Sequence, residues 1–148
     1  MRLVLAPVGR VKEAPLRALL DDYYTRIQRY TTLREVELRE GRPAEVLAAG
    51  RRVLDAEGPR ALPVALEVQG EALTSEGLAR RLGGHLDAGG VPVFFLGGAE
   101  GLPAELSREA RWRLSLGPLT LPHRLARLVL AEQVYRAFTI LRGEPYHK

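Results

Sequence analysis

The sequence predicts a single α/β domain whose mostly parallel sheet is flanked by helices. Short apolar runs of strand length alternate with longer segments whose apolar residues recur every three or four positions, and this alternation is typical of strand–helix–strand units. The chain has 148 residues, of which 46% are hydrophobic. That length suits one buried core and is too short for two comfortable ones. No linker or internal repeat interrupts the pattern, so we expect one domain over residues 1–148.

The first half of the chain predicts two strands and two helices. Residues 2–8 read as a strand, residues 33–38 alternate like a half-exposed edge strand, and residues 43–57 read as a helix that Gly58 ends. Pro15 suits the first turn of the other helix. The apolar face of that helix consists of Leu16, Leu19, Leu20, Tyr23, Ile27 and Tyr30.

The second half repeats the alternation and adds a long last helix. Residues 61–68 are another apolar run and predict a central parallel strand, and residues 69–73 predict a loop. A helix capped by Thr74 or Ser75 then runs to about Ala88. The remaining elements are expected to be a buried strand at 91–96, a strand at 112–116 and a helix at 122–141.

Composition excludes several classes of chemistry. With no cysteine and three scattered histidines, we expect no disulfide, no thiolate nucleophile and no metal site. No apolar run approaches the roughly 20 residues of a membrane span, and no secretory signal is present, so we expect a cytoplasmic protein without a membrane partner. The net charge is +4 and only Lys12 and Lys148 are lysines. Arginine pairs well with phosphate, so the excess permits a nucleic-acid partner, although a solvated surface explains it equally.

Three loops that follow predicted strands are the candidate binding site. They are residues 66–73, 96–103 and 116–122, and ligands in open α/β sheets lie outside the carboxyl ends of the strands. The pair Gly97-Gly98 permits close approach of a ligand to the backbone, although an ordinary strand-to-helix turn would also explain it. The loop 117–122 is mostly apolar, with one glycine and two prolines, which favours a rigid wall for a flat heterocycle.

The ligand class follows from what these loops lack. No G-x-G-x-x-G or G-x-x-x-x-G-K-[ST] motif occurs, and Glu100 lies where a phosphate would be repelled. An adenine-bearing cationic cofactor remains possible, and S-adenosylmethionine is the obvious one because it carries a sulfonium and no phosphate.

Three stretches of the chain resemble one known family. They are RLVLAPVGR (residues 2–10), FFLGGAEGLP (94–103) and LSLGPLTLPHRLARLVLAEQVYRAFTILRGEPYHK (114–148). Together they resemble the RlmH family of ribosomal RNA large-subunit methyltransferases, which belongs to the SPOUT superfamily. The resemblance implies the SPOUT, or α/β-knot, fold with a C-terminal trefoil knot over about residues 66–148. General rules of chain topology argue against a knot, so the resemblance alone predicts it.

The resemblance also implies an activity and a set of cofactor contacts. The activity is S-adenosylmethionine-dependent methylation of N3 of a pseudouridine in 23S ribosomal RNA, by a homodimer that acts on assembled ribosomes. The family's loop varies between Leu116 and Leu119, so we expect backbone rather than side-chain roles there. The implied cofactor-binding residues are Leu66, Gly97, Leu116, Gly117, Pro118, Leu119, Thr120 and Leu121.

An imide nitrogen such as N3 must lose its proton as the methyl group arrives, so a base or anion stabiliser is needed. His123 begins a helix, whose dipole favours a neutral imidazole. The alternative for His123 is a purely structural hydrogen bond at the helix start. The alternative for Glu100 is an ordinary loop carboxylate, and the alternative for Arg136 is an ion pair with Glu132 within the helix. The candidates by residue type are His123, Glu100, Arg136, Tyr146 and His147.

The last helix and the tail suggest a dimer. One apolar face of the helix consists of Ala126, Val129, Leu130, Val134, Ala137, Ile140 and Leu141, and a second stripe of Leu128, Ala131, Tyr135 and Phe138. The second stripe predicts a partner surface, although a helix sandwiched within its own domain gives the same pattern. Gly143 ends the helix and Pro145 prevents its resumption. We therefore expect an extended tail that completes the opposite subunit's active site, the alternative being a disordered or merely packed terminus.

Three other functions remain open from the sequence. They are a non-catalytic RNA- or ribosome-binding protein, an α/β enzyme with another adenosyl ligand such as a nucleosidase, and a methyltransferase of another RNA. Because the chain has no separate RNA-reading domain, we expect a preformed target and poor activity on naked RNA.

Overall fold

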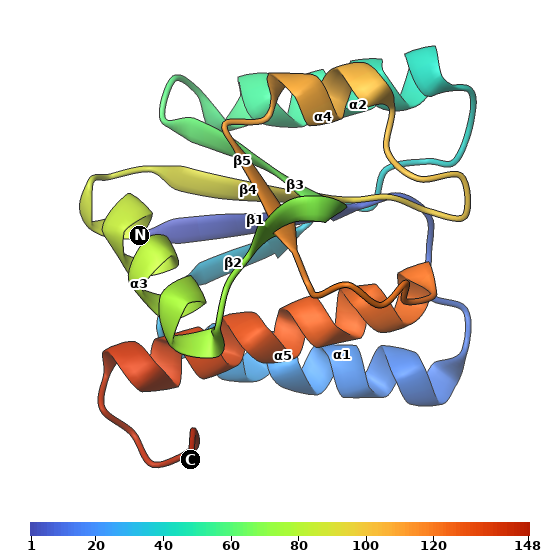
Figure 1. Cartoon of the computed structure of the whole chain (residues 1–148). Helices are drawn as coiled ribbons and strands as arrows, with labels where there is room; N and C mark the ends of the chain where they lie inside the picture. Colours follow the sequence, from blue (N-terminus) through green and yellow to red (C-terminus); the bar gives the residue numbers. More distant parts are fainter.

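A computed structural model describes all 148 residues as one five-stranded sheet with helices on both faces (Figure 1). Every pair of neighbouring strands is parallel, and the strand order is β2-β1-β4-β3-β5. The predicted fold class is therefore confirmed. The strands are β1 (Arg2–Pro7), β2 (Thr32–Glu35), β3 (Ala61–Ala72), β4 (Val91–Leu96) and β5 (Trp112–Ser115).

Each helix that connects two strands lies on the face set by the direction in which the chain crosses the sheet. One face carries α1 (Ala14–Ile27), α3 (Ser75–Asp87) and α5 (His123–Leu141), and the other carries α2 (Pro43–Glu57) and α4 (Ala104–Glu109) (Figure 1). Connections that move across the sheet toward the β2 edge lie on the first face, and those that move toward the β5 edge lie on the second. This arrangement is expected when all the strand–helix–strand crossovers have the same handedness. The connections that leave the neighbouring strands β1 and β4 run in opposite directions. A crevice is expected at the carboxyl ends of such strands.

The core lies on both sides of β4. All six residues of β4 are buried, which confirms the predicted strand and explains why its sequence is continuously apolar. Phe94 belongs to the larger core cluster, under α1, α3 and α5, and Phe95 to the smaller one, under α2 and α4. None of the helices combines the length and hydropathy that crossing a membrane requires.

Strand β3 extends beyond its predicted end. The sequence predicted a loop at residues 69–73, but the strand continues to Ala72, with Leu66 and Glu71 both in register with Leu114. The second half of β3 thus forms an arm that passes in front of β5 in Figure 1. A Cβ at Gly70 would lie only 2.8 Å from the carbonyl carbon of Arg113, so glycine is required at this crossing. The turn-like residues Gln69 to Glu71 concealed the pairing, because β5 is distant in sequence.

Strand β2 is shorter than predicted. It ends at Glu35 instead of Leu38, and a single bridge between Val8 and Leu38 continues the pairing. The strand forms one edge of the sheet, as its alternating sequence predicted.

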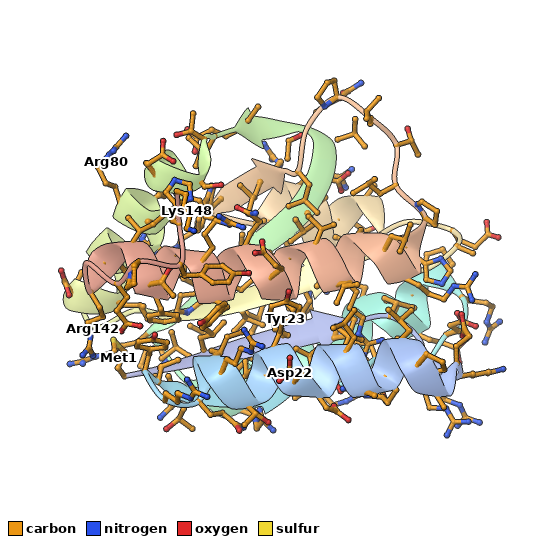
Figure 2. The ribbon with its side chains drawn as sticks, turned by 90° about the horizontal axis from the view of Figure 1, so that it is seen from below. Met1, Asp22, Tyr23, Arg80, Arg142 and Lys148 are labelled. Atoms are coloured by element: carbon orange, nitrogen blue, oxygen red, sulfur yellow. The ribbon has the colours of Figure 1, made fainter.

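Helix α5 is buried on two sides by its own domain. Leu130 and Val134 of the first stripe are buried, and so are Tyr135 and Phe138 of the second. The second stripe packs against α1, which lies beside α5 with Tyr23 between the two helices (Figure 2). The interpretation of this stripe as a free partner surface is therefore wrong, because the domain itself uses it.

A buried arginine fixes the first half of α5 against β2 and α1. The side chain of Arg127 is 5% exposed and donates hydrogen bonds to Glu35 at 2.8 Å and to Glu37 at 2.6 Å. Tyr24 of α1 donates a further hydrogen bond to Glu35. Burial favours the neutral form of the Glu35 carboxyl, but the bonds from Tyr24 and Arg127 outweigh it and hold the pKa of Glu35 below its usual value. The charges thus compensate one another where α5 begins.

Substituting the glycine at the β3–β5 crossing should destabilise the fold. We expect Gly70→Ala to lower the free energy of unfolding by about 1–3 kcal/mol or more, because the added methyl group meets backbone that cannot move aside. The matched control is Gly84→Ala in α3, where an added Cβ meets nothing within 4 Å. This control substitution should stabilise the helix by about 0.5–1 kcal/mol. Urea unfolding curves measure both changes. Equal stability of the two variants would contradict the proposed steric role of the crossing.

Candidate functional site

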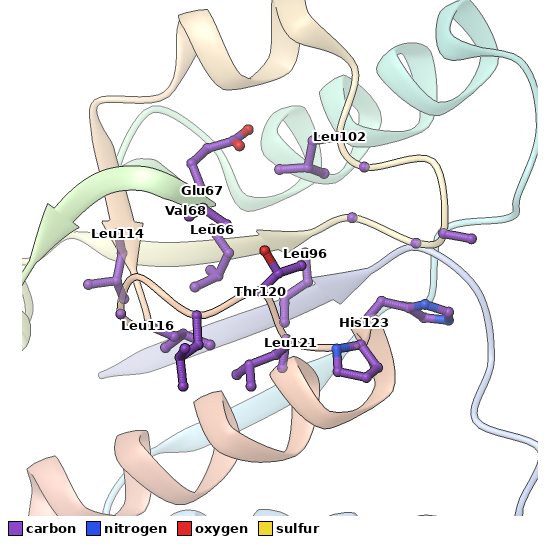
Figure 3. Close-up of a pocket in the computed structure, with 18 residues that line it drawn as sticks. Leu66, Glu67, Val68, Leu96, Leu102, Leu114, Leu116, Thr120, Leu121 and His123 are labelled. Carbon is purple, nitrogen blue, oxygen red and sulfur yellow. The ribbon is translucent and has the colours of Figure 1, made fainter.

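A cavity of about 400 Å³ opens at the carboxyl ends of the strands (Figure 3). Its walls come from β3, the loop after β4, the end of β5, the loop that follows and the start of α5. The lining residues are Leu66, Glu67, Val68, Leu96, Gly97, Gly98, Ala99, Gly101, Leu102, Leu114, Leu116, Gly117, Leu119, Thr120, Leu121, Pro122, His123 and Ala126.

Two of the three predicted loops, 96–103 and 116–122, line this cavity, whereas the third segment, 66–73, contributes to it as part of strand β3. Of the predicted cofactor-binding residues, Pro118 is absent from the lining. The others are present, namely Leu66, Gly97, Leu116, Gly117, Leu119, Thr120 and Leu121. The structure therefore brings the predicted residues together, while ligand binding by them stays a prediction.

Two glycine turns shape the walls. A Cβ at Gly97 would lie 2.6 Å from the backbone of Gly101, so the loop after β4 closes tightly on itself. Gly101 has φ +76° and Gly117 has φ +123°, a region that L side chains rarely adopt. The Ser115 hydroxyl donates to the carbonyl of Gly117 and accepts from its N–H, both at 3.1 Å. These contacts fix the end of β5 where the loop turns into the cavity.

The lining is largely apolar, with few polar side chains. Glu67 is its one acidic residue, and His123 is the other titratable group. Figure 3 shows the two on opposite sides of the cavity. An apolar cavity with one carboxylate suits a ligand that has a flat ring and a separate positive charge better than it suits a phosphate. No group of three or more histidine, aspartate and glutamate side chains is placed to hold a metal ion.

The sequence interpretation missed Glu67. Its signal was available in principle, because Glu67 directly follows Leu66 at a predicted strand end. A lone charged residue in an apolar strand usually faces solvent, however, so only the arm of β3 reveals that Glu67 lines the cavity.

The predicted catalytic residues fall into two places. His123 lines the cavity, whereas Glu100 does not. Arg136 and the tail residues Tyr146 and His147 form a separate cluster. Arg136 follows His123 by 13 positions on α5, which corresponds to roughly 20 Å along a helix axis. One chain therefore does not bring all the predicted catalytic residues together.

The tail packs on its own domain, which corrects the expectation that it leaves extended. The Tyr146 ring lies 4.7 Å from that of Tyr135, and its hydroxyl donates to Glu132 at 2.6 Å. His147 lies 3.0 Å from the Arg136 guanidinium and 2.6 Å from the carboxylate of Glu76. Burial, and then the bond to Glu132, raise the pKa of Tyr146. Aromatic and charged contacts with α5 thus outweigh the freedom that Gly143 and Pro145 allow. The ion pair between Arg136 and Glu132 is also present, at 2.9 Å.

Comparison with known proteins gives consistent matches over the whole chain. A family model described as "Predicted SPOUT methyltransferase" matches residues 1–147. A protein of Sorangium cellulosum named ribosomal RNA large subunit methyltransferase H is 52% identical over 147 residues, covering 99% of both chains. A protein of the same name from Rhodospirillum centenum is 45% identical over 151 residues, covering 100% of this chain and 99% of its own.

The fold also resembles a solved structure. A probable methylase family protein from Haemophilus influenzae superposes with a TM-score of 0.53 at 11% identity, covering 99% of this chain and 70% of that one. At this identity the likeness concerns the fold alone.

Proposed function

The chain belongs to the SPOUT methyltransferase family, and from this premise we propose that it transfers a methyl group from S-adenosylmethionine to large-subunit ribosomal RNA. The observation that carries the proposal is the cavity where β3 meets the loops after β4 and β5. Relatives with 52% and 45% identity, matched over nearly their full length, bear the name of such an enzyme. Apart from Leu66, Glu67 and Val68 of β3, the residues that line the cavity belong to the stretches 94–103 and 114–148, which resemble that family.

The chemistry of the cavity fits this cofactor. A volume of about 400 Å³ lies in the range of small-molecule sites. The leucines of the loop 116–121 offer an apolar surface for adenine, and the backbone of that loop offers hydrogen bonds. Glu67 supplies the one negative charge for a cationic ligand. When bound, S-adenosylmethionine supplies an electrophilic methyl group, and the chain's own task is to position it and exclude water.

We further propose that the target is N3 of a pseudouridine in 23S RNA, as the family resemblance implies. N3 must lose a proton, and His123 is the predicted catalytic residue that lines the cavity of the same chain. Arg136, Tyr146 and His147 complete the site only if a second copy brings its tail cluster to this cavity. The exposed apolar side chains near the cavity mouth support such an arrangement, since Leu119 is 78% exposed and Val68 is 53% exposed.

The proposed enzyme is thus a cytoplasmic homodimer that acts on assembled ribosomes. The single domain has no separate RNA-reading module, so recognition depends on a preformed target. We also propose the trefoil knot over about residues 66–148. The proposal is supported by the close crossing at Gly70, where β5 runs behind the β3 arm (Figure 1).

Ligand-dependent melting and methyl transfer test the proposed function together. S-adenosylmethionine and S-adenosylhomocysteine at 100 times Kd should each stabilise the protein by about 2.7 kcal/mol, while ATP has no effect. Labelled methyl groups should then appear in large subunits, at a position that mass mapping identifies. Stabilisation without transfer would favour a non-catalytic RNA-binding protein, and a response to adenosine alone would favour a nucleosidase. No response to either sulfur ligand contradicts the methyltransferase proposal.

Glu67 should discriminate the cationic cofactor from its neutral product. We expect Glu67→Gln to weaken S-adenosylmethionine about fivefold and S-adenosylhomocysteine hardly at all, because a charge pair at about 4 Å in water contributes about 1 kcal/mol. Calorimetric titration measures both dissociation constants. Glu100→Gln is the matched control, since Glu100 is a nearby carboxylate outside the lining, and should change neither. An equal loss for both ligands would show that Glu67 does not sense the sulfonium.

Removal of Tyr146 to Lys148 should separate binding from transfer. We expect cofactor affinity to persist and methyl transfer to fall about hundredfold, the order of what a general base contributes. The control is removal of Lys148 alone, which is exposed and takes no part in the ion pairs of the tail cluster. Light scattering on both variants checks the dimer. Unchanged transfer in the longer truncation would exclude a catalytic role for the tail.

A further inference from the structure

A second cavity lies beside the first and differs from it in chemistry. It encloses about 810 Å³ between the loop after β1, the segment after β2 and the start of α5. We propose that it binds backbone phosphates of the RNA substrate, next to the nucleotide that is methylated. This proposal rests on the proposed function, because it assumes that the substrate is RNA. We call the second cavity the basic cleft and define it by Arg10, Lys12 and Arg39.

The three defining residues are cations without an ion-pair partner. All three side chains are exposed, and none takes part in a salt bridge. The neighbouring carboxylates are mostly occupied: Glu13 pairs with Arg124, and Glu37 accepts a hydrogen bond from Arg127 at 2.6 Å. Glu40 is the one acid of the lining without a salt bridge, and its carboxylate packs against the backbone of Gly9. The cleft therefore keeps an excess of positive charge that the fold does not use.

The position of the cleft suits a nucleotide whose base reaches the first cavity. His123 lines both cavities, and Figure 3 shows it at the rim of the first. The loops join as well, because the N–H of Val8 donates to the carbonyl of Leu96 at 2.9 Å, directly before Gly97. The loops after β1 and β2 and the loop after β4 thus share one edge of the sheet. A base at the methyl donor would leave its phosphates on the side of the cleft.

The lining favours RNA over a protein partner. Leu38 is the sole hydrophobic residue among the ten that line the cleft. Protein interfaces are built around apolar and aromatic anchors and are depleted of charge at the centre. Nucleic-acid interfaces are polar and positively charged, and arginine binds phosphate oxygens through two parallel hydrogen bonds. The unpaired cations therefore match a polyanion rather than a polypeptide surface.

The test compares two full-length variants that remove equal charge. In the first variant, Arg10, Lys12 and Arg39 are all changed to Ala. In the control variant, Arg29, Arg52 and Arg80 are changed to Ala. These three arginines are exposed and take part in no salt bridge. For the first variant we expect an increase of 10- to 100-fold in KM for large ribosomal subunits, with kcat, melting temperature and S-adenosylmethionine affinity retained. The slope of log Kd against log salt for subunit binding should fall by about one unit per removed contact. The control should stay within twofold of the unchanged protein.

Each further outcome has one meaning. An unchanged KM and salt slope in the first variant overturns the proposal, and so does an equal effect in the control, because net charge alone would then explain it. Competition by polyglutamate as strong as that by a short RNA also overturns it, since the cleft would then be a general anion site. If the unchanged protein binds subunits through the cleft but transfers no methyl group, the cleft stands and the proposed function fails.

Discussion

The close crossing of the β3 arm over β5 is the constraint on which the cavity depends. At this point the backbone of Gly70 lies against that of Arg113, at a separation that excludes any side chain. The crossing makes Leu66 and Glu71 neighbours of the same residue, Leu114. The chain that leaves β5 therefore passes close to the end of β3 and to the loop after β4.

Helix α5 carries this arrangement into the rest of the domain. It packs on the sheet and lies between α1 and α3, and Arg127 holds its first half through Glu35 and Glu37. A helix buried in this way is a rigid spacer. It places His123 at the cavity and the cluster of Arg136 with the tail at its far end. This separation is the physical reason for proposing that two copies are needed to assemble all the candidate catalytic groups.

The carboxyl edge of the sheet also keeps a negatively charged region apart from a positively charged one. The cavity where β3 meets the loops after β4 and β5 is largely apolar and contains one carboxylate, whereas the basic cleft next to it has unpaired cations. A cationic cofactor and a polyanionic RNA have opposite electrostatic needs, and a common site would compromise both. With His123 between the two regions, the same sheet edge can hold both partners of the proposed reaction without mixing their charges.

The sequence by itself determined the elements whose signals are local. The periodicity of α1 and the apolar run of β4 predicted them correctly, and the Thr74 hydroxyl accepts a hydrogen bond from the N–H of Gly77, as a helix cap should. The convergence of the loops after β4 and β5 also followed from local pattern, because the carboxyl ends of parallel strands share an edge.

Only the tertiary structure decided the features that depend on distant partners. Pairing with β5 turned a turn-like segment into the β3 arm and brought Glu67 to the cavity. The second apolar stripe of α5 is buried against α1, and contacts with Tyr135 and Glu132 hold the tail against its own domain. The first two outcomes depend on residues far apart in sequence, and the third depends on a reversal of the chain after α5. Local sequence patterns do not display contacts of either kind.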